Sequence, residues 1–204
     1  MALVRVPPQP AVGLGRLARW GLVAAVPAAL YAGTVTAPWL WDDHLCFVES
    51  PAFLAPGNLK TIVSPEAVLR AGWPGGPVLR PLPLATYFAD RALWGKDPAG
   101  PRAVNLALHA ANALLLWRIL VRLAPSAALG GALLWALHPV HSEVVQCVAF
   151  RNSLLLGFGV LGGTLAWLRG RPTLALAGWI VALLSKEAAL AFPAVLICLN
   201  ARGG

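Results

Sequence analysis

The chain has 204 residues, of which 58% are hydrophobic and only 12% are charged, with a formal net charge of +8. Soluble globular domains carry about a quarter charged residues, so this composition excludes an ordinary soluble domain and predicts an all-α, multi-pass transmembrane helical bundle. The basic residues stand singly between apolar runs rather than in patches with interleaved aromatic residues, which argues against nucleic acid as a partner.

The apolar runs predict about five to six membrane segments, since a spanning helix needs about 20 largely apolar residues. In chain order the runs are 20–41, 104–123, 127–140, 152–168 and 173–199. The first run contains Val35-Thr36-Ala37, which resembles a signal-peptide cleavage site, but its apolar core is longer than usual for a signal peptide. We therefore expect a retained anchor.

The last run, 173–199, is interrupted by Ser185-Lys186-Glu187. It is either one tilted helix or a hairpin of two short halves, and we favour the hairpin because short half-helices are tolerated where they face a protein-lined cavity. Residues 42–103 are too polar to span a membrane and predict one large outer loop. The expected organisation is a cytoplasmic tail at 1–19 and a membrane domain at 20–204.

The distribution of charge predicts the orientation of the bundle. With a cytoplasmic N-terminus, the inner side holds arginines and no acidic residue, whereas 42–103 holds six basic and six acidic residues. The inner arginines are Arg5, Arg16, Arg19, Arg118, Arg122, Arg169 and Arg171. The positive-inside rule then places any site on the outer or luminal face, in a bacterial inner membrane or the endoplasmic reticulum.

The polar residues that membranes normally exclude gather on this outer side. Asp42 and Asp43 directly follow the first apolar run, and Asn105, His109 and Asn112 share one helical face through their i, i+4, i+7 spacing. The other candidates are His44, Arg80, His138, His141, Glu143, Arg151, Lys186 and Glu187. Each also has an ordinary interpretation, as a solvated interface residue or an interhelical hydrogen bond. Their convergence from at least five segments favours a functional site.

This set of residues suits group transfer from a phosphate leaving group. A carboxylate beside a second carboxylate can act as a general base, and Arg80, Arg151 and Lys186 can neutralise a phosphate. There is no phosphate-binding loop and no serine-nucleophile elbow, so we expect no nucleotide cofactor. His138, His141 and Glu143 could hold a divalent metal, but Pro139 disrupts the helical geometry of such a set. The need for a metal is therefore left open.

Six short motifs occur in one order between about Trp39 and Pro193. They are Trp41-Asp42-Asp43, Arg80-Pro81-Leu82, Asn105-Leu106-Ala107-Leu108-His109-Ala110-Ala111-Asn112, His138-Pro139-Val140-His141-Ser142-Glu143, Arg151-Asn152-Ser153-Leu154-Leu155, and Leu184-Ser185-Lys186-Glu187 with Pro193. In this order they resemble the membrane half of the TMTC-type proteins. These multi-pass proteins carry tetratricopeptide repeats and are related to the protein O-mannosyltransferases of the GT-C glycosyltransferase fold.

The resemblance implies a polyprenyl- or dolichyl-phosphate sugar donor held among membrane lipid, and a protein or glycan acceptor on the non-cytoplasmic face. It also implies an acidic catalytic residue in the first outer loop. Asp42 is the preferred base because it resembles the first acid of the mannosyltransferase Asp-Glu pair, with Asp43 next. Family members continue with further spans and repeats beyond the position of Gly204, so we expect the GT-C-like domain here to be incomplete.

Two other functions stay open at this point. One is a non-catalytic membrane partner or a truncated fragment of such an enzyme, which keeps the fold without a full site. The other is a small transporter that uses the same polar face as a pathway. Transporters commonly show internal repeats, and the sequence shows none, so the glycosyltransferase is favoured.

Overall fold

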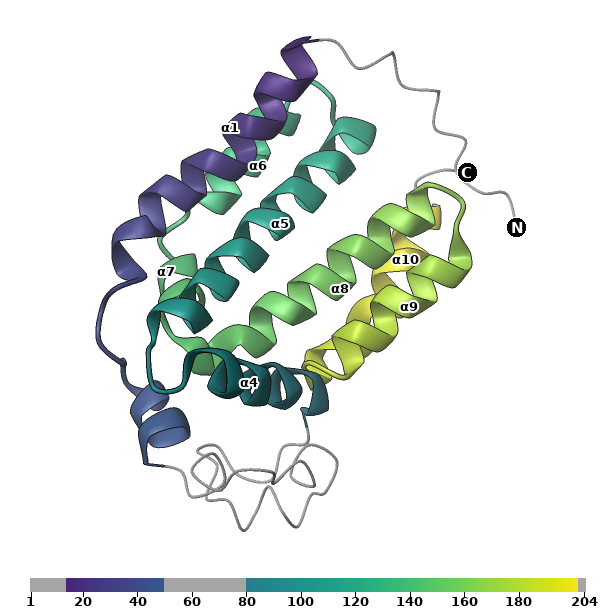
Figure 1. Cartoon of the computed structure of the whole chain (residues 1–204). Coiled ribbons are helices and arrows are strands. Elements are labelled where there is room, and N and C mark those ends of the chain that lie inside the picture. Colours follow the sequence, from purple (N-terminus) through teal and green to yellow (C-terminus); the bar gives the residue numbers. More distant parts are fainter. Residues whose placement is uncertain (1–13, 50–79, 202–204) are drawn as a thin grey trace.

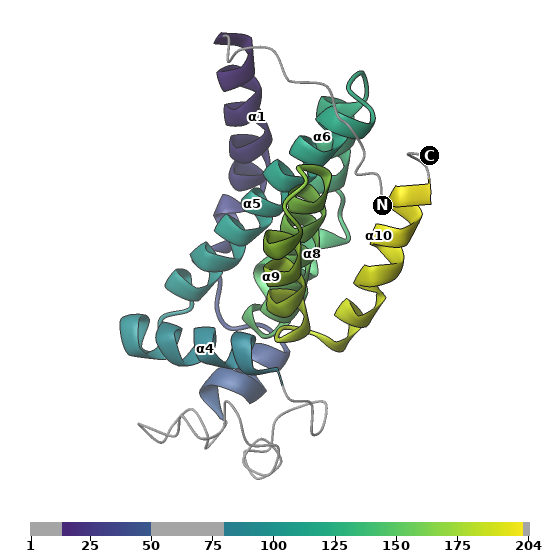
Figure 2. The ribbon, with the colours of Figure 1, turned by 90° about the vertical axis from the view of Figure 1, so that its right-hand side faces the viewer.

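The computed structural model describes residues 14–49 and 80–201, and these residues form helices and turns with no strand among them. The all-α prediction is therefore confirmed for this part of the chain. Three long helices, α1 (Leu14–Tyr31), α5 (Ala99–Leu123) and α8 (Arg151–Leu168), run lengthwise through the bundle. Helix α4 (Pro81–Trp94) lies across one end of them (Figures 1 and 2). We call this the α4 end.

Helix α5 is the central helix of the bundle. On one side it packs against α1 and α6 (Ala128–Ala136), in an apolar cluster that includes Val23, Ala113 and Ala132. On the other side, Ile119 packs against Leu165 and Leu168 of α8. These contacts fix the polar residues of α5 relative to three neighbouring helices.

Helices α8 and α9 (Pro172–Leu183) pack with their backbones almost in contact. A Cβ atom added to Gly159 would lie 2.6 Å from the carbonyl oxygen of Gly178, and one added to Gly178 would lie 2.7 Å from the Cα of Gly163. Small residues at such spacing let helices approach closely in membranes. Any side chain at these glycines would push α8 and α9 apart.

The polar break at Ser185-Lys186-Glu187 is a turn. Helix α9 ends at Leu183, the 3₁₀ helix η5 (Glu187–Ala191) follows, and α10 (Phe192–Ala201) then runs back in the opposite direction (Figure 2). The indole N–H of Trp179 donates a 2.9 Å hydrogen bond to the carbonyl of Ala189, which holds η5 against α9. The structure agrees with the hairpin that the sequence favoured.

Two helices among the described residues are long and apolar enough to cross a membrane, Ala99–Leu123 and Val148–Leu168. The predicted segment 127–140 is divided, because α6 ends at Ala136 and α7 (His141–Gln146) starts after Pro139, which disfavours helical backbone at the residue before it. Nine residues of α6 span only about 14 Å, against about 30 Å of hydrocarbon. The number of five to six membrane segments stays a prediction.

The other predicted boundaries also shift. Helix α1 covers 14–31 rather than 20–41. The 3₁₀ turn η1 (Ala32–Thr34) follows it and contains Gly33, a residue type that disfavours helices. The predicted outer loop 42–103 contains the π-helical turn η2 (His44–Val48), α4 and the start of α5. Within the predicted tail and loop, residues 1–13 and 50–79 lie outside the described residues.

Candidate functional site

The Asp42–Asp43 pair lies where the chain turns from α1 into η2. Trp41, directly before the pair, has a φ of 41°, in the left-handed region that an L-residue with a large side chain adopts at a cost. Such strain persists only when the surrounding structure holds the turn in place. Asp42 is half-buried and Asp43 is fully buried, so the two neighbouring carboxylates have different environments.

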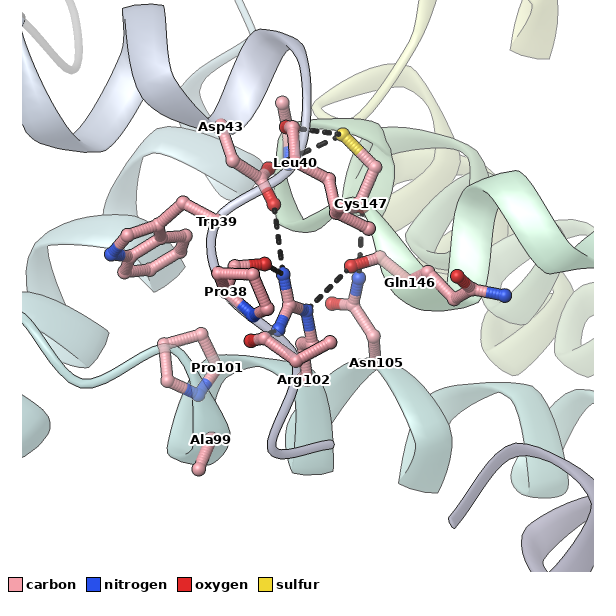
Figure 3. A network of polar contacts seen from close by, with 12 residues as sticks. Pro38, Trp39, Leu40, Asp43, Ala99, Pro101, Arg102, Asn105, Gln146 and Cys147 are labelled. Atoms are coloured by element: carbon pink, nitrogen blue, oxygen red, sulfur yellow. Dashed lines mark hydrogen bonds and ion pairs between the residues drawn. The ribbon is translucent and has the colours of Figure 1, made fainter. Parts of the chain in front are cut away.

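The Asp43 carboxylate is anchored at the junction of α7 and α8. Its Oδ1 accepts hydrogen bonds from the backbone N–H of Ala149, at 2.9 Å, and from the Cys147 thiol, at 3.2 Å. Its Oδ2 lies 3.8 Å from a guanidinium nitrogen of Arg102 (Figure 3). Burial raises the pKa of Asp43, although these partners act in the opposite direction. Asp43 thus ties the turn to the bundle.

Arg102, a residue that the sequence analysis did not single out, clamps the segment that leads into this turn. Its Nε donates a 2.8 Å hydrogen bond to the carbonyl of Gln146, and its two terminal nitrogens donate to the carbonyls of Ala37 and Pro38 (Figure 3). The sequence could have indicated Arg102, because it lies one helical turn before Asn105 on the same face of the helix. Arg102 connects α5 and α7 with residues 37–43.

Arg151 forms a second buried cluster at the α4 end. Its three guanidinium nitrogens lie 2.6 Å from Oδ2 of Asp90, 2.7 Å from Oδ1 of Asn105 and 2.8 Å from the Pro101 carbonyl. The guanidinium also lies 5.4 Å from the centre of the Tyr87 ring. The structure therefore brings the predicted residues Asn105 and Arg151 together, with Asp90, which the sequence analysis missed, as the ionic partner. Phosphate binding by Arg151 stays a prediction.

Arg80, Lys186 and Glu187 meet where the start of α4 approaches the α9–η5 turn. Arg80 forms a bidentate ion pair with Glu187, in which the shortest distance, 2.9 Å, joins Nη2 of Arg80 to Oε1 of Glu187. The side chain of Arg80 is 23% exposed and that of Glu187 is 60% exposed. The hydrogen bond from Arg80 lowers the pKa of Glu187. The Lys186 ammonium, which is half-buried, donates a 3.1 Å hydrogen bond to the Ser153 hydroxyl. Lys186 therefore has a neutral partner, whereas Arg80 has a carboxylate.

The histidines form a separate group between α5, α6 and α7. His109 is buried, and its Nε2 lies 2.8 Å from the carbonyl oxygen of Ala136. The centre of its ring lies 5.1 Å from the centre of the His141 ring. Burial lowers the pKa of His141 to about 4, and the neighbouring charges of His109 and His138 act in the same direction. His141 is thus neutral near pH 7.

The remaining predicted residues have simpler surroundings. His44, His138 and Glu143 are exposed, and the buried Asn112 donates a 2.9 Å hydrogen bond to the Leu154 carbonyl, as an interhelical contact does. Residues 14–49 and 80–201 contain no group of three or more His, Cys, Asp or Glu side chains arranged to hold a metal ion. The histidine motif therefore does not form a metal site with Glu143 in this part of the chain.

Besides the buried Asn105 and Arg151, two groups of predicted site residues lie at the α4 end, the aspartate pair and the Arg80–Lys186 group, whereas the histidines form a group apart. Phe47 of η2 packs edge-on against Tyr87 of α4 at 5.0 Å, so α4 connects the two groups. Within the described residues, no hydrogen bond or ion pair joins the aspartates directly to Arg80 or Lys186.

One comparison with known proteins found a relative of this chain. The chain is 28% identical over 192 residues to Protein O-mannosyl-transferase Tmtc1 of Drosophila melanogaster, a match that covers 86% of this chain and 21% of that protein. The chain therefore spans about a fifth of the length of this relative. No protein-family model and no solved structure matches the chain. The similarity supports a TMTC-like relationship.

Proposed function

We propose that this chain contributes to a membrane glycosyltransferase that moves a mannose-like sugar from a polyprenyl- or dolichyl-phosphate donor to a protein or glycan acceptor on the non-cytoplasmic face. The observation that carries the proposal is the aspartate pair, in which the anchored Asp43 holds the half-buried Asp42 at the α4 end. The similarity to a protein named as an O-mannosyl-transferase supplies the reaction class.

In this proposal Asp42 is the general base. Its carboxylate accepts the proton of the acceptor hydroxyl while the hydroxyl oxygen attacks the anomeric carbon of the sugar. The bond between that carbon and the donor phosphate oxygen breaks, and its electrons leave with the phosphate. The Arg102 clamp and the bonds to Asp43 hold the Asp42 backbone in place, so that the base need not be oriented during the reaction.

The phosphate leaving group needs a cation, and Lys186 fits this role best. Its ammonium donates a hydrogen bond to a neutral hydroxyl, so its charge is available to a phosphate, whereas the charge of Arg80 is shared with Glu187. Arg151 is fully buried and paired with Asp90. We therefore assign Arg151 to positioning Asn105 and α4, and Lys186, with Arg80 beside it, to the donor phosphate.

Lys186→Gln tests the phosphate site. We expect the variant to bind a polyprenyl phosphate more weakly by about 1.5–3 kcal/mol, because it loses one charge-assisted hydrogen bond. Binding is measured with the full chain in detergent micelles, by native mass spectrometry of the retained lipid. Lys96→Gln is the matched control, because Lys96 is exposed in the turn between α4 and α5 and loses the same charge. Equal binding by both variants would remove the argument for a phosphate-linked donor.

The orientation is tested with single cysteines at the two ends of α5. Lys96 precedes this helix and Ser126 follows it, so the two positions lie on opposite sides if α5 crosses the membrane. In a Cys198→Ser background, we expect an impermeant thiol reagent to label Lys96→Cys in intact cells and Ser126→Cys only after permeabilisation. The reverse pattern would place the aspartate pair on the cytoplasmic face and contradict the proposed donor.

A further inference from the structure

Five of the described arginines lie at the end of the bundle opposite to α4, which we call the arginine end. They are Arg19 in α1, Arg118 and Arg122 in the last turns of α5, and Arg169 and Arg171 in the turn between α8 and α9. The contact of Ile119 with Leu165 and Leu168 joins the last turns of α5 and α8. Figure 1 shows the C-terminal end of α5 and the α8–α9 turn at the same end of the molecule.

No described acidic residue lies in the segments that carry Arg19, Arg122, Arg169 and Arg171. All of the eight acidic residues except Glu66 lie in the described ranges. These seven acidic residues belong to segments at or near the α4 end. The segments are η2 and its flanks, α4 and the turn after it, α7, and the start of η5, where Glu187 forms an ion pair with Arg80. Partial burial lowers the pKa of Arg169, and the charges of Arg118, Arg122 and Arg171 lower it further. An anion from outside the described residues would relieve this repulsion.

The surroundings of the arginines are those of a membrane interface. The Arg118 guanidinium lies 4.9 Å from the centre of the Trp20 ring, and Trp20 packs edge-on against Trp117 at 5.4 Å. Tryptophan is enriched at the boundary between lipid and water. Directly beyond the α8–α9 turn, the first two turns of α9 carry Leu174 and Leu176, large apolar side chains that are about half exposed. The cationic groups therefore border an apolar surface suited to acyl chains.

We propose that the arginine end binds the headgroup phosphates of anionic phospholipids. Arginine presents a planar fork of donors that matches a phosphate bidentately, and basic clusters beside membrane helices attract anionic lipid. A free phosphate would use the same donors, but the exposed leucines beside them favour a lipid over a soluble anion. This proposal does not depend on the sugar-transfer reaction, whose residues lie at the other end.

The test uses the full chain in mixed micelles, with phosphatidylglycerol and phosphatidylcholine as competing probes. We expect native mass spectrometry to show preferential retention of phosphatidylglycerol. In the double variant Arg122→Gln/Arg171→Gln, the affinity for phosphatidylglycerol should fall by roughly fivefold for each charge removed. The matched control Arg91→Gln/Lys96→Gln removes two charges at the α4 end and should retain the lipid as the parent does.

Two results would overturn the proposal. One is equal retention of phosphatidylglycerol by the double variant and by its control, with unchanged helix content in circular dichroism. The other is displacement of the lipid by inorganic phosphate at the same concentration, which would make the arginine end a general anion site. The Lys186→Gln variant should keep phosphatidylglycerol at the arginine end, so failure of this proposal is distinguishable from failure of the donor site.

Discussion

Asp42→Asn should abolish sugar transfer while the protein remains folded and inserted in the membrane. Asparagine keeps the size and most of the hydrogen-bonding capacity of aspartate, but it does not accept a proton from the acceptor hydroxyl. General-base catalysis typically contributes about 10²–10⁴-fold, and we expect a loss of that order. The measurement is the transfer of labelled mannose from a polyprenyl phosphate to an acceptor. It uses membranes that contain the full-length protein.

The adjacent acid provides the control for this experiment. Asp43→Asn leaves an oxygen that can still accept the hydrogen bond from the Ala149 N–H, but it removes the ion pair with Arg102. We expect a smaller loss of transfer than in Asp42→Asn, together with a lower unfolding temperature, because Asp43 anchors the turn. If both variants kept the parental transfer rate, the acidic pair would be an interfacial anchor and the proposed mechanism would be wrong.

The helical bundle and its polar end follow from patterns that the sequence carries locally. The i, i+4, i+7 spacing of Asn105, His109 and Asn112 predicted one functional face, and all three side chains are buried, each with a hydrogen-bond partner on a neighbouring segment. Amide and imidazole groups cost free energy when buried without partners, so a polar stripe on an apolar helix predicts interhelical contacts. The spacing predicted which residues face the interior of the bundle. It could not predict which groups form hydrogen bonds with them.

The partners depend on tertiary packing, and for that reason the sequence analysis missed Asp90 and Arg102. Asp90 lies in a stretch rich in Pro and Gly that we interpreted as outer loop. In the structure this stretch includes α4, which begins at Pro81 and buries Leu84 and Tyr87 on one face. Proline at the first position of a helix and apolar residues three apart were usable signals for that helix. The pairing of Asp90 with Arg151, 61 positions further along the chain, had no local signal.

This pairing leads to the largest expected effect on stability. Arg151→Ala should lower the free energy of unfolding by about 3–5 kcal/mol, the range found when one partner of a buried ion pair is removed. The substitution leaves the buried Asp90 carboxylate without its cation, and it removes the donors to Asn105 and to the Pro101 carbonyl. The measurement is unfolding in detergent micelles, followed by circular dichroism.

Two further variants separate the ion pair from general effects of removing an arginine. Arg91→Ala removes the neighbouring charge on α4, whose hydrogen bond goes to the Gly95 carbonyl of its own turn, and should change the free energy of unfolding by less than about 1 kcal/mol. In Arg151→Met/Asp90→Asn, both charges are absent and the buried methionine fills part of the space, so the double variant should be more stable than Arg151→Ala. If Arg151→Ala were no less stable than Arg91→Ala, the buried pair would not hold α4 to the bundle. Arg151 would then be available for the donor phosphate, as the sequence first suggested.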